Sequence, residues 1–192
     1  MKELRSDPRR EAILMSALQA FASYGFRKTS MDDIASGAGM SRPAVYLHYK
    51  NKAAIVRSLT ERHYEDKLVA IREALAGSGS VSETLTRAIK AHCEGMATIL
   101  ASPHGLELLD AGKSNAPDIV TKGEAELAAI YAEWLKQEAD SGRARLADTP
   151  DEVAKTITAA LKGIKLTSAD AEEFERRVSQ LASLFGAGLE VR

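Results

Sequence analysis

Two glycines inside a run of helical sequence limit what the N-terminal third of this chain can fold into. Gly37 and Gly39 separate a segment that begins near Met31 from a second segment that begins at Ser41. A glycine permits the positive φ angle that a tight connection between two helices requires. The apolar residues that the two segments would bury against each other are Ile34, Ala38, Met40 and Val45. This pattern predicts a helix-turn-helix over about residues 31–50.

The rest of the chain also carries helical periodicity, and no useful stretch shows the period-two alternation of a half-buried strand. Apolar stripes and helix-capping residues predict helices at about 9–24, 31–36, 51–76, 81–101, 104–113, 117–140, 150–166 and 171–188. Gly77-Ser78-Gly79-Ser80 is the most linker-like stretch. The predicted fold class is all-α.

The second segment of the motif leaves several chemically active side chains on its outer face if Val45 points inward. Such a helix fits the DNA major groove, where its first residues reach base edges. Arg42 has the forked geometry that matches guanine O6 and N7, and the Ala44 methyl can meet a thymine methyl. Tyr46 and His48 can donate to phosphates or bases. We expect Tyr49, three residues after Tyr46, to pack inward.

Phosphate contacts are expected at two neighbouring helix starts. Lys52 lies in the first turn of the helix that follows the motif, where the helix dipole favours an anion. Thr29 and Ser30 lie at the start of the first motif helix and could bind phosphate in the same way. The charge distribution agrees, because residues 1–63 hold 11 Lys and Arg against 6 Asp and Glu, whereas the whole chain has a net charge of −1.

The string AFASYGFRKTSMDDIASGAGMSRPAVYLHYKNK, within residues 9–55, resembles the N-terminal DNA-binding domain of the TetR family of bacterial transcriptional regulators. The resemblance covers about the first third of the chain. It implies a three-helix helix-turn-helix DNA-binding domain at 1–55 and a larger helical ligand-binding and dimerisation domain at 56–192. It also implies a homodimer that binds a palindromic double-stranded DNA operator and a small-molecule effector.

The same resemblance assigns roles to individual residues. Thr29, Tyr46 and Lys52 would hold phosphates, while the base-facing residues would be Arg42, Pro43, Ala44, Leu47 and His48. Many relatives have glycine followed by threonine or serine where this chain has Pro43 and Ala44. Since Ala44 has no hydroxyl donor, base reading at that position should be apolar or absent.

Effector-binding candidates come from the apolar faces of two later helices. Pockets between helices, lined by apolar and a few polar side chains, are where small molecules usually bind. Each candidate alone is more typical of a packed core. The candidates are His92, Cys93, Met96, His104, Tyr131 and Trp134.

The last two predicted helices, within 150–188, offer a surface for dimerisation. Both carry long apolar stripes, and small residues such as Gly163 and Gly186 permit close helix approach. Two such helices from each of two chains would make a four-helix bundle. A two-fold dimer would place the reading helices about 34–36 Å apart, on successive major grooves.

The sequence also bears on location and on other functions. No apolar run approaches the ~18 residues of a membrane span, the charged N-terminus lacks a signal-peptide block, and a single cysteine suits a reducing cytoplasm. The motifs of hydrolases, nucleotide-binding enzymes and zinc proteases are missing, so we expect no enzyme activity, no metal and no cofactor beyond the effector.

The predicted function is a sequence-specific transcriptional regulator, a repressor released from its operator by a small molecule. Three alternatives stay open at this point. The protein could activate transcription, since the sign of regulation rests on the resemblance alone. It could respond to oxidation through Cys93, although a buried thiol is more often inert. It could also be an interaction protein that has lost DNA binding, against which the retained Thr29, Arg42, Tyr46 and Lys52 argue.

Overall fold

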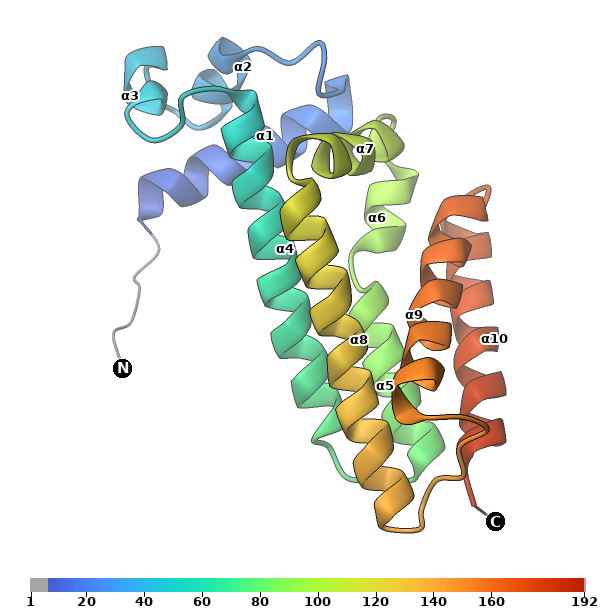
Figure 1. Cartoon of the computed structure of the whole chain (residues 1–192). Coiled ribbons are helices and arrows are strands. Elements are labelled where there is room, and N and C mark those ends of the chain that lie inside the picture. Colours follow the sequence, from blue (N-terminus) through green and yellow to red (C-terminus); the bar gives the residue numbers. More distant parts are fainter. Residues whose placement is uncertain (1–6, 192) are drawn as a thin grey trace. The chain divides into compact units, whose positions relative to one another are not determined.

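The computed structural model describes residues 7–191, and within this range every regular element is a helix (Figure 1). The predicted all-α class is confirmed. The outer limits of the two predicted domains, residues 1 and 192, lie outside the described residues. The helices are α1 (Pro8–Tyr24), α2 (Met31–Gly37), α3 (Arg42–Tyr46), α4 (Lys52–Leu75), α5 (Val81–Cys93), α6 (Met96–Ala101), α7 (Gly105–Asn115), α8 (Pro117–Asp140), α9 (Pro150–Thr167) and α10 (Ala171–Leu189).

Most helices begin at a residue whose side chain caps the free backbone N–H groups of the first turn. Ser30 and Ser80 form capping boxes with the acidic residue three positions later, at the starts of α2 and α5. Thr149 accepts from the backbone of Glu152 at the start of α9, where Pro150 follows it. These local signals explain why the helix starts match the sequence pattern closely.

One predicted helix is wrong. The stretch 81–101 forms two helices, because the chain leaves the helical conformation at Glu94 (ψ 137°) and turns through Gly95 (φ 74°). Glycine adopts this positive φ without a Cβ clash. The ammonium group of the buried Lys67 donates to the carbonyls of Ala91 (3.0 Å) and Glu94 (2.6 Å). The break therefore leaves these two carbonyls hydrogen-bonded inside the protein.

The helices form two compact units. Unit 1 comprises the chain up to His63 together with Ile99–Val120. Its core contains residues from α1, α2, α3 and α4, and also Leu108 and Ala111 of α7. Residues 99–120 therefore pack with the helix-turn-helix, although more than thirty residues separate them from it in the sequence. The predicted N-terminal domain, which ends at residue 55, does not contain residues 99–120.

Unit 2 comprises Tyr64–Thr98 and Thr121–Arg192. Within it α10 packs along α5 and also contacts α9 (Figure 1). A Cβ on Gly186 of α10 would lie 2.3 Å from the Ser82 hydroxyl of α5, so the two backbones approach as closely as a glycine allows. The paired extended residues Ala144 and Glu190 fix the segment after α8 to the end of α10.

The sequence contains no apolar run long enough to span a membrane, and the helices agree with this. Across residues 7–191 no helix combines the length and the apolar character needed to cross a bilayer.

Candidate nucleic-acid interface

The helix-turn-helix is held together from inside by a few fully buried side chains. Ile34 of α2 and Val45 of α3 have no exposed surface, and Tyr49, after α3, is 3% exposed. Gly39 has a φ of 65° in the turn between the two helices, as its position in the motif predicts. The inward orientation of Val45 and Tyr49 is confirmed, and it determines which side chains of α3 point outward.

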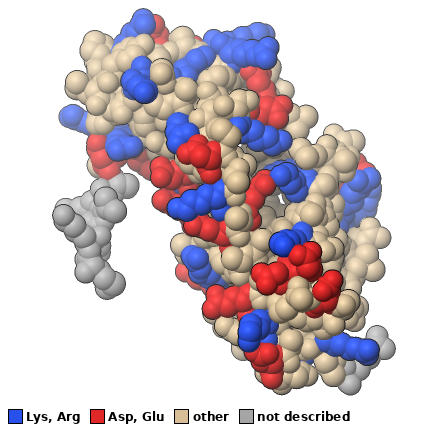
Figure 2. Space-filling model, in the orientation of Figure 1, with Lys and Arg blue, Asp and Glu red and all other residues tan. Residues whose placement is uncertain are grey.

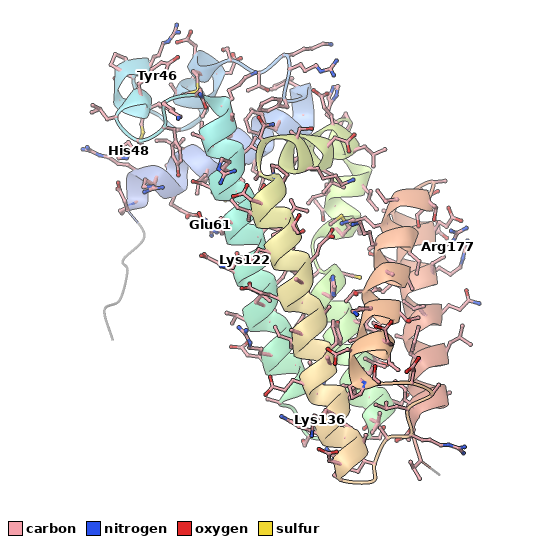
Figure 3. All side chains as sticks on the ribbon, in the orientation of Figure 1. Tyr46, His48, Glu61, Lys122, Lys136 and Arg177 are labelled. Atoms are coloured by element: carbon pink, nitrogen blue, oxygen red, sulfur yellow. The ribbon has the colours of Figure 1, made fainter. Side chains whose placement is uncertain are left out.

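The outward side chains form one face, which we name the α3 face: Arg42, Pro43, Ala44, Tyr46, Leu47 and His48. Four of these residues are exposed, and Ala44 and His48 are half-buried. Leu47 is 85% exposed, an unusual environment for a large aliphatic side chain in a folded chain. Tyr46 on α3 and His48 in the following turn both lie at the same end of unit 1 (Figure 3).

Helix α3 itself is short and ends at Tyr46. Ser41 caps its start through the Ala44 N–H (3.3 Å), and Pro43 lies in the first turn, where a missing N–H costs nothing. Leu47 and His48 follow in a turn whose N–H groups donate to the carbonyls of Pro43 and Val45. These hydrogen bonds keep Leu47 and His48 on the α3 face.

Arg42 is fixed from two sides. Its Nη1 donates to Asp32 Oδ2 of α2 at 2.9 Å, and its Nη2 lies 3.4 Å from the Tyr46 hydroxyl. The guanidinium carbon is 5.5 Å from the centre of the Tyr46 ring. The contact with Tyr46 and the charge of Asp32 raise the pKa of Arg42. Arg42 therefore stays a cation, and its guanidinium is oriented before any DNA is bound.

Two further contacts join the turn after α3 to the start of α1, and the sequence pattern did not reveal them. His48 Nδ1 lies 3.4 Å from Asp7 Oδ2, and Asp7 also caps α1. Arg10 of α1 lies over the Tyr49 ring, 5.2 Å from its centre, with Nε 3.4 Å from the tyrosine hydroxyl. Asp7 and Arg10 resemble ordinary residues of an exposed helix start, so only the three-dimensional contacts identify their role.

The hydroxyls of Thr29 and Ser30, for which we predict phosphate contacts, are both hydrogen-bonded within the fold, and the phosphate contacts stay predictions. Thr29 is 2% exposed, and its hydroxyl donates to the carbonyls of Gly25 (2.8 Å) and Ala20 (3.3 Å). The Ser30 hydroxyl donates to Asp33 Oδ2 at 2.7 Å within the capping box, and the Ser30 bonds lower the pKa of Asp33. Neither hydroxyl proton is available to a phosphate in this structure.

Lys52, also predicted to bind phosphate, makes several bonds within the fold. Its ammonium donates to the carbonyls of Phe26 (2.5 Å), Thr29 (2.5 Å) and Arg27 (3.3 Å), which belong to the loop between α1 and α2. The nitrogen also lies 4.7 Å from the centre of the Phe26 ring. An ammonium has three donors, so the loop uses all of them. In this structure Lys52 holds the loop, and its contact with phosphate stays a prediction.

His104 does not join the other effector candidates. It belongs to unit 1, where its backbone N–H donates to the Ala22 carbonyl of α1 and its ring Nδ1 lies 3.2 Å from a carboxylate oxygen of Glu107. Glu107 in turn accepts from the Arg27 backbone N–H at 3.0 Å, and this bond lowers the pKa of Glu107. His104 and Glu107 thus connect α7 to the loop that Lys52 also holds, and the effector contact of His104 stays a prediction.

The other five candidates lie in unit 2, and two of them touch. The His92 ring of α5 and the Tyr131 ring of α8 are stacked, with centroids 6.0 Å apart and the hydroxyl 3.4 Å from Nδ1. Burial raises the pKa of Tyr131, so its hydroxyl stays protonated. Met96 and Trp134 are buried, and Cys93 is half-buried.

Cys93 has the properties of an unreactive thiol. Burial raises its pKa to about 11, against smaller opposing effects of Lys67 and Lys165. At pH 7 only about one thiol in 10⁴ would then be ionised, and the thiolate is the reactive form. No contact in this region favours the redox alternative.

The described residues offer no metal site, since no three His, Cys, Asp or Glu side chains among residues 7–191 come together in a way that could hold an ion. Charge is also dispersed. Figure 2 shows Lys and Arg side chains spread among acidic and uncharged residues over the face drawn, without one dense basic patch. The α3 face is therefore defined by its position on the motif and by the chemistry of its side chains.

Comparison with known proteins agrees with this geometry. Residues 13–59 match the family model described as bacterial regulatory proteins, tetR family. The HTH-type transcriptional activator FasR of Mycolicibacterium smegmatis is 31% identical over 46% of this chain, but the match spans only 40% of FasR. The HTH-type transcriptional repressor Rv1474c of Mycobacterium tuberculosis is 28% identical over 90% of this chain and 89% of its own length.

Solved structures show a similar fold over most of the chain. SmeT, the repressor of the Stenotrophomonas maltophilia multidrug efflux pump SmeDEF, superposes with a TM-score of 0.71, covering 95% of this chain and 90% of SmeT. At 19% identity this likeness concerns the fold alone. The buried helix-turn-helix core, the outward α3 face, the family-model match over residues 13–59 and the similarity to Rv1474c along nearly the whole chain all agree with the resemblance to the TetR family of bacterial transcriptional regulators.

Proposed function

We propose that the protein is a homodimeric repressor that places α3 in the major groove of a palindromic operator and is released by a small molecule bound in unit 2. The observation that carries the DNA-binding part is the orientation of α3. Val45 and Tyr49 are buried, whereas Arg42, Tyr46 and Leu47 are exposed on the opposite side. A helix with an arginine, a tyrosine and an uncovered leucine on its outer face suits hydrogen bonds to guanine and apolar contact with thymine methyls.

Repression rather than activation is supported by proteins that are similar along most of this chain. Rv1474c, which matches along 89% of its length, is a repressor, as is SmeT. FasR is an activator, but the similarity to it spans less than half of that protein. We therefore propose repression, and a reporter gene behind the selected operator would show the sign directly.

Dimerisation is supported by uncovered apolar side chains on the last two helices. Leu166 near the end of α9 is 51% exposed, and Leu184 of α10 is 67% exposed. A Cβ on Gly163 of α9 or Gly188 of α10 would meet no atom within 4 Å. Small and apolar residues on adjacent helices suit a four-helix bundle formed by two chains.

Response to a small molecule is supported by the way α7 is built into unit 1. Leu108 and Ala111 of α7 are part of the same core as Ile34 and Val45 of the helix-turn-helix. The chain reaches α7 from α5 and α6 and leaves it through α8, and α5 and α8 carry the His92–Tyr131 pair. A molecule that displaced α5 or α8 would act on α7 through the backbone, and packed cores switch between discrete arrangements rather than deform continuously.

Selection of bound sequences from random DNA tests the DNA-binding proposal. We expect an inverted repeat with half-sites about one helical turn apart. Arg42→Ala should relax the preference at one position of each half-site by about 1–3 kcal/mol. Lys136→Ala, which removes an exposed cation from unit 2 (Figure 3), is the matched control and should leave the selected sequence unchanged. Enrichment of no sequence by the wild type would refute the proposal.

The single tryptophan gives a separate test of the effector site. Trp134 lies one helical turn from Tyr131 on α8, so its fluorescence reports on that part of unit 2. We expect a panel of apolar and aromatic molecules to contain compounds that change this fluorescence and lower operator affinity. His92→Phe should abolish both effects. A compound that releases DNA equally well from His92→Phe and wild type would place the effector site elsewhere.

A further inference from the structure

Asp32 is an acidic residue beside the face that we propose reads DNA. It occupies the first turn of α2, and its side chain is 60% exposed. Its neighbour Asp33, not Asp32, completes the capping box with Ser30. Asp32 is therefore not needed to begin the helix, and its carboxylate instead reaches across the turn of the motif to Arg42 of α3, at 2.9 Å.

This contact changes what Arg42 can do. The side chain of Arg42 is 55% exposed, and a long exposed side chain of this kind normally samples many rotamers. Here Asp32 holds Nη1, and the Tyr46 hydroxyl and ring hold the other side of the guanidinium. Three of the five N–H donors remain for a base edge. Ordering the group in advance removes part of the entropy that binding would otherwise cost.

The contact also has an opposing effect. A carboxylate next to a DNA-binding face repels phosphates, and that repulsion acts on every sequence equally. The orientation of Arg42 matters only where the opposite base is one that its fork matches, which is guanine. A carboxylate at this place thus weakens binding to random DNA while it strengthens the preference for guanine.

We propose that Asp32 is a specificity-determining positioning residue, which aims Arg42 at a guanine in each half-site while lowering affinity for other sequences. This inference rests on the proposed function. It differs from a general electrostatic effect because it predicts two changes of opposite sign on removal of one carboxylate. It also predicts that the change in base preference requires Arg42.

The experiment compares wild type, Asp32→Ala, Asp32→Asn, Arg42→Ala and the Asp32→Ala/Arg42→Ala double variant. Each is titrated against the selected operator, operators with every single-base change, and random DNA. For Asp32→Ala we expect the guanine preference at one position to fall about three- to tenfold, since only part of the discrimination of a bidentate contact is lost. Affinity for random DNA should rise, and the thermal midpoint should stay unchanged because the pair is exposed.

The other variants separate positioning from charge. Asp32→Asn keeps an oxygen acceptor for Arg42 and should retain part of the guanine preference. It also provides the test of the inference if Asp32→Ala folds poorly. In the Arg42→Ala background, Asp32→Ala should alter no base preference. Glu61→Gln, which removes an exposed acid of unit 1 on α4 (Figure 3), should change all affinities uniformly.

Three results would overturn the inference: an unchanged guanine preference in both Asp32 variants, the same loss in the presence and absence of Arg42, or an equal loss for Glu61→Gln. A wild type that selects no sequence would instead refute the proposed function. A wild type that selects an operator while Asp32→Ala reads it normally would refute this inference alone.

Discussion

Replacement of Lys52 by alanine should destabilise unit 1 rather than remove a phosphate contact. The variant loses two close charge-assisted hydrogen bonds, from the ammonium to the carbonyls of Phe26 and Thr29 at 2.5 Å each. At the low end for partly exposed groups these are worth about 1.5 kcal/mol each. Against this, folding of the variant no longer includes the entropy cost of ordering the lysine side chain, roughly 1 kcal/mol. The net loss is about 2 kcal/mol, or about 4–8 °C in thermal midpoint for a chain of this size.

Circular dichroism melts at one protein concentration measure this loss, and operator titrations at several salt concentrations show its consequence. If Lys52 stabilises the loop between α1 and α2, Lys52→Ala weakens binding to all DNA without changing the salt slope. If it binds phosphate, the slope of log K against log salt becomes shallower by about 2 per dimer, since each contact contributes about 0.9. A midpoint equal to that of wild type together with the shallower slope would refute our interpretation.

Lys50 supplies the matched control for this experiment. It lies two residues before Lys52 and its side chain is exposed, so Lys50→Ala removes the same charge from the same turn without removing the loop bonds. An exposed substitution of this kind changes stability by no more than about 0.5 kcal/mol. A midpoint that falls equally in both variants would mean that charge, and not the bonds to the loop, causes the loss.

Three further predictions concern packing, pH and assembly. Gly123→Ala gains about 1 kcal/mol of helix propensity, but its Cβ would lie 2.3 Å from the Tyr64 ring, and overpacking costs up to about 3 kcal/mol. We expect the free energy of unfolding in urea to fall by about 2 kcal/mol. The loss in the double variant Gly123→Ala/Tyr64→Ala should be smaller than the sum of the two single losses, because the two side chains are in contact. The bond from Arg57 lowers the pKa of Asp118 to about 2, so this pair stabilises the fold above the ordinary carboxyl pKa and the effect disappears as pH falls toward 2. The stability difference between wild type and Asp118→Asn at pH 7 should therefore vanish near pH 2. Leu184→Glu should shift the protein to monomer in sedimentation and weaken operator binding; a dimer of unchanged affinity would contradict the proposed interface.

The helices themselves were largely predictable because their ends carry local signals. The limits of α8 agree with the predicted 117–140, and those of α9 with 150–166 to within one residue. Proline in the first turn and a capping threonine act over one turn of chain, so the sequence contains the whole cause. The break at Gly95 was missed because the apolar stripe continues on both sides of it, and periodicity does not register a two-residue turn.

The place of α7 was not predictable from the same signals. An apolar stripe shows that Leu108 and Ala111 are buried, but it does not show which neighbour covers them. The contacts that settle the question are the core of the helix-turn-helix and the bonds of His104 and Glu107 to α1 and the following loop. These partners are about eighty residues away in sequence, which is beyond the range of any local pattern.

The outward direction of α3 was predictable from the sequence, whereas the internal hydrogen bonds of Thr29, Ser30 and Lys52 were not, and the reason is physical. Burial of Val45 and Tyr49 follows from apolar character and spacing, and it fixes the outward direction of Arg42, Tyr46 and Leu47. A hydroxyl or an ammonium carries no such directional information, because backbone carbonyls and phosphates satisfy it equally well. Polar residues beside a loop therefore need the structure before a role can be assigned.

The use of polar groups inside unit 1 bears on how such a protein can be released from DNA. The hydroxyls of Thr29 and Ser30 and the ammonium of Lys52 are bound within the fold, so fewer groups remain to grip phosphate. In the proposed dimer, binding would then depend more on the two α3 faces meeting successive major grooves together. When two connected binding sites must be engaged at once, a change in the distance between them removes most of the affinity that the connection adds. A small molecule that altered that separation would release the operator without touching a single DNA-binding residue.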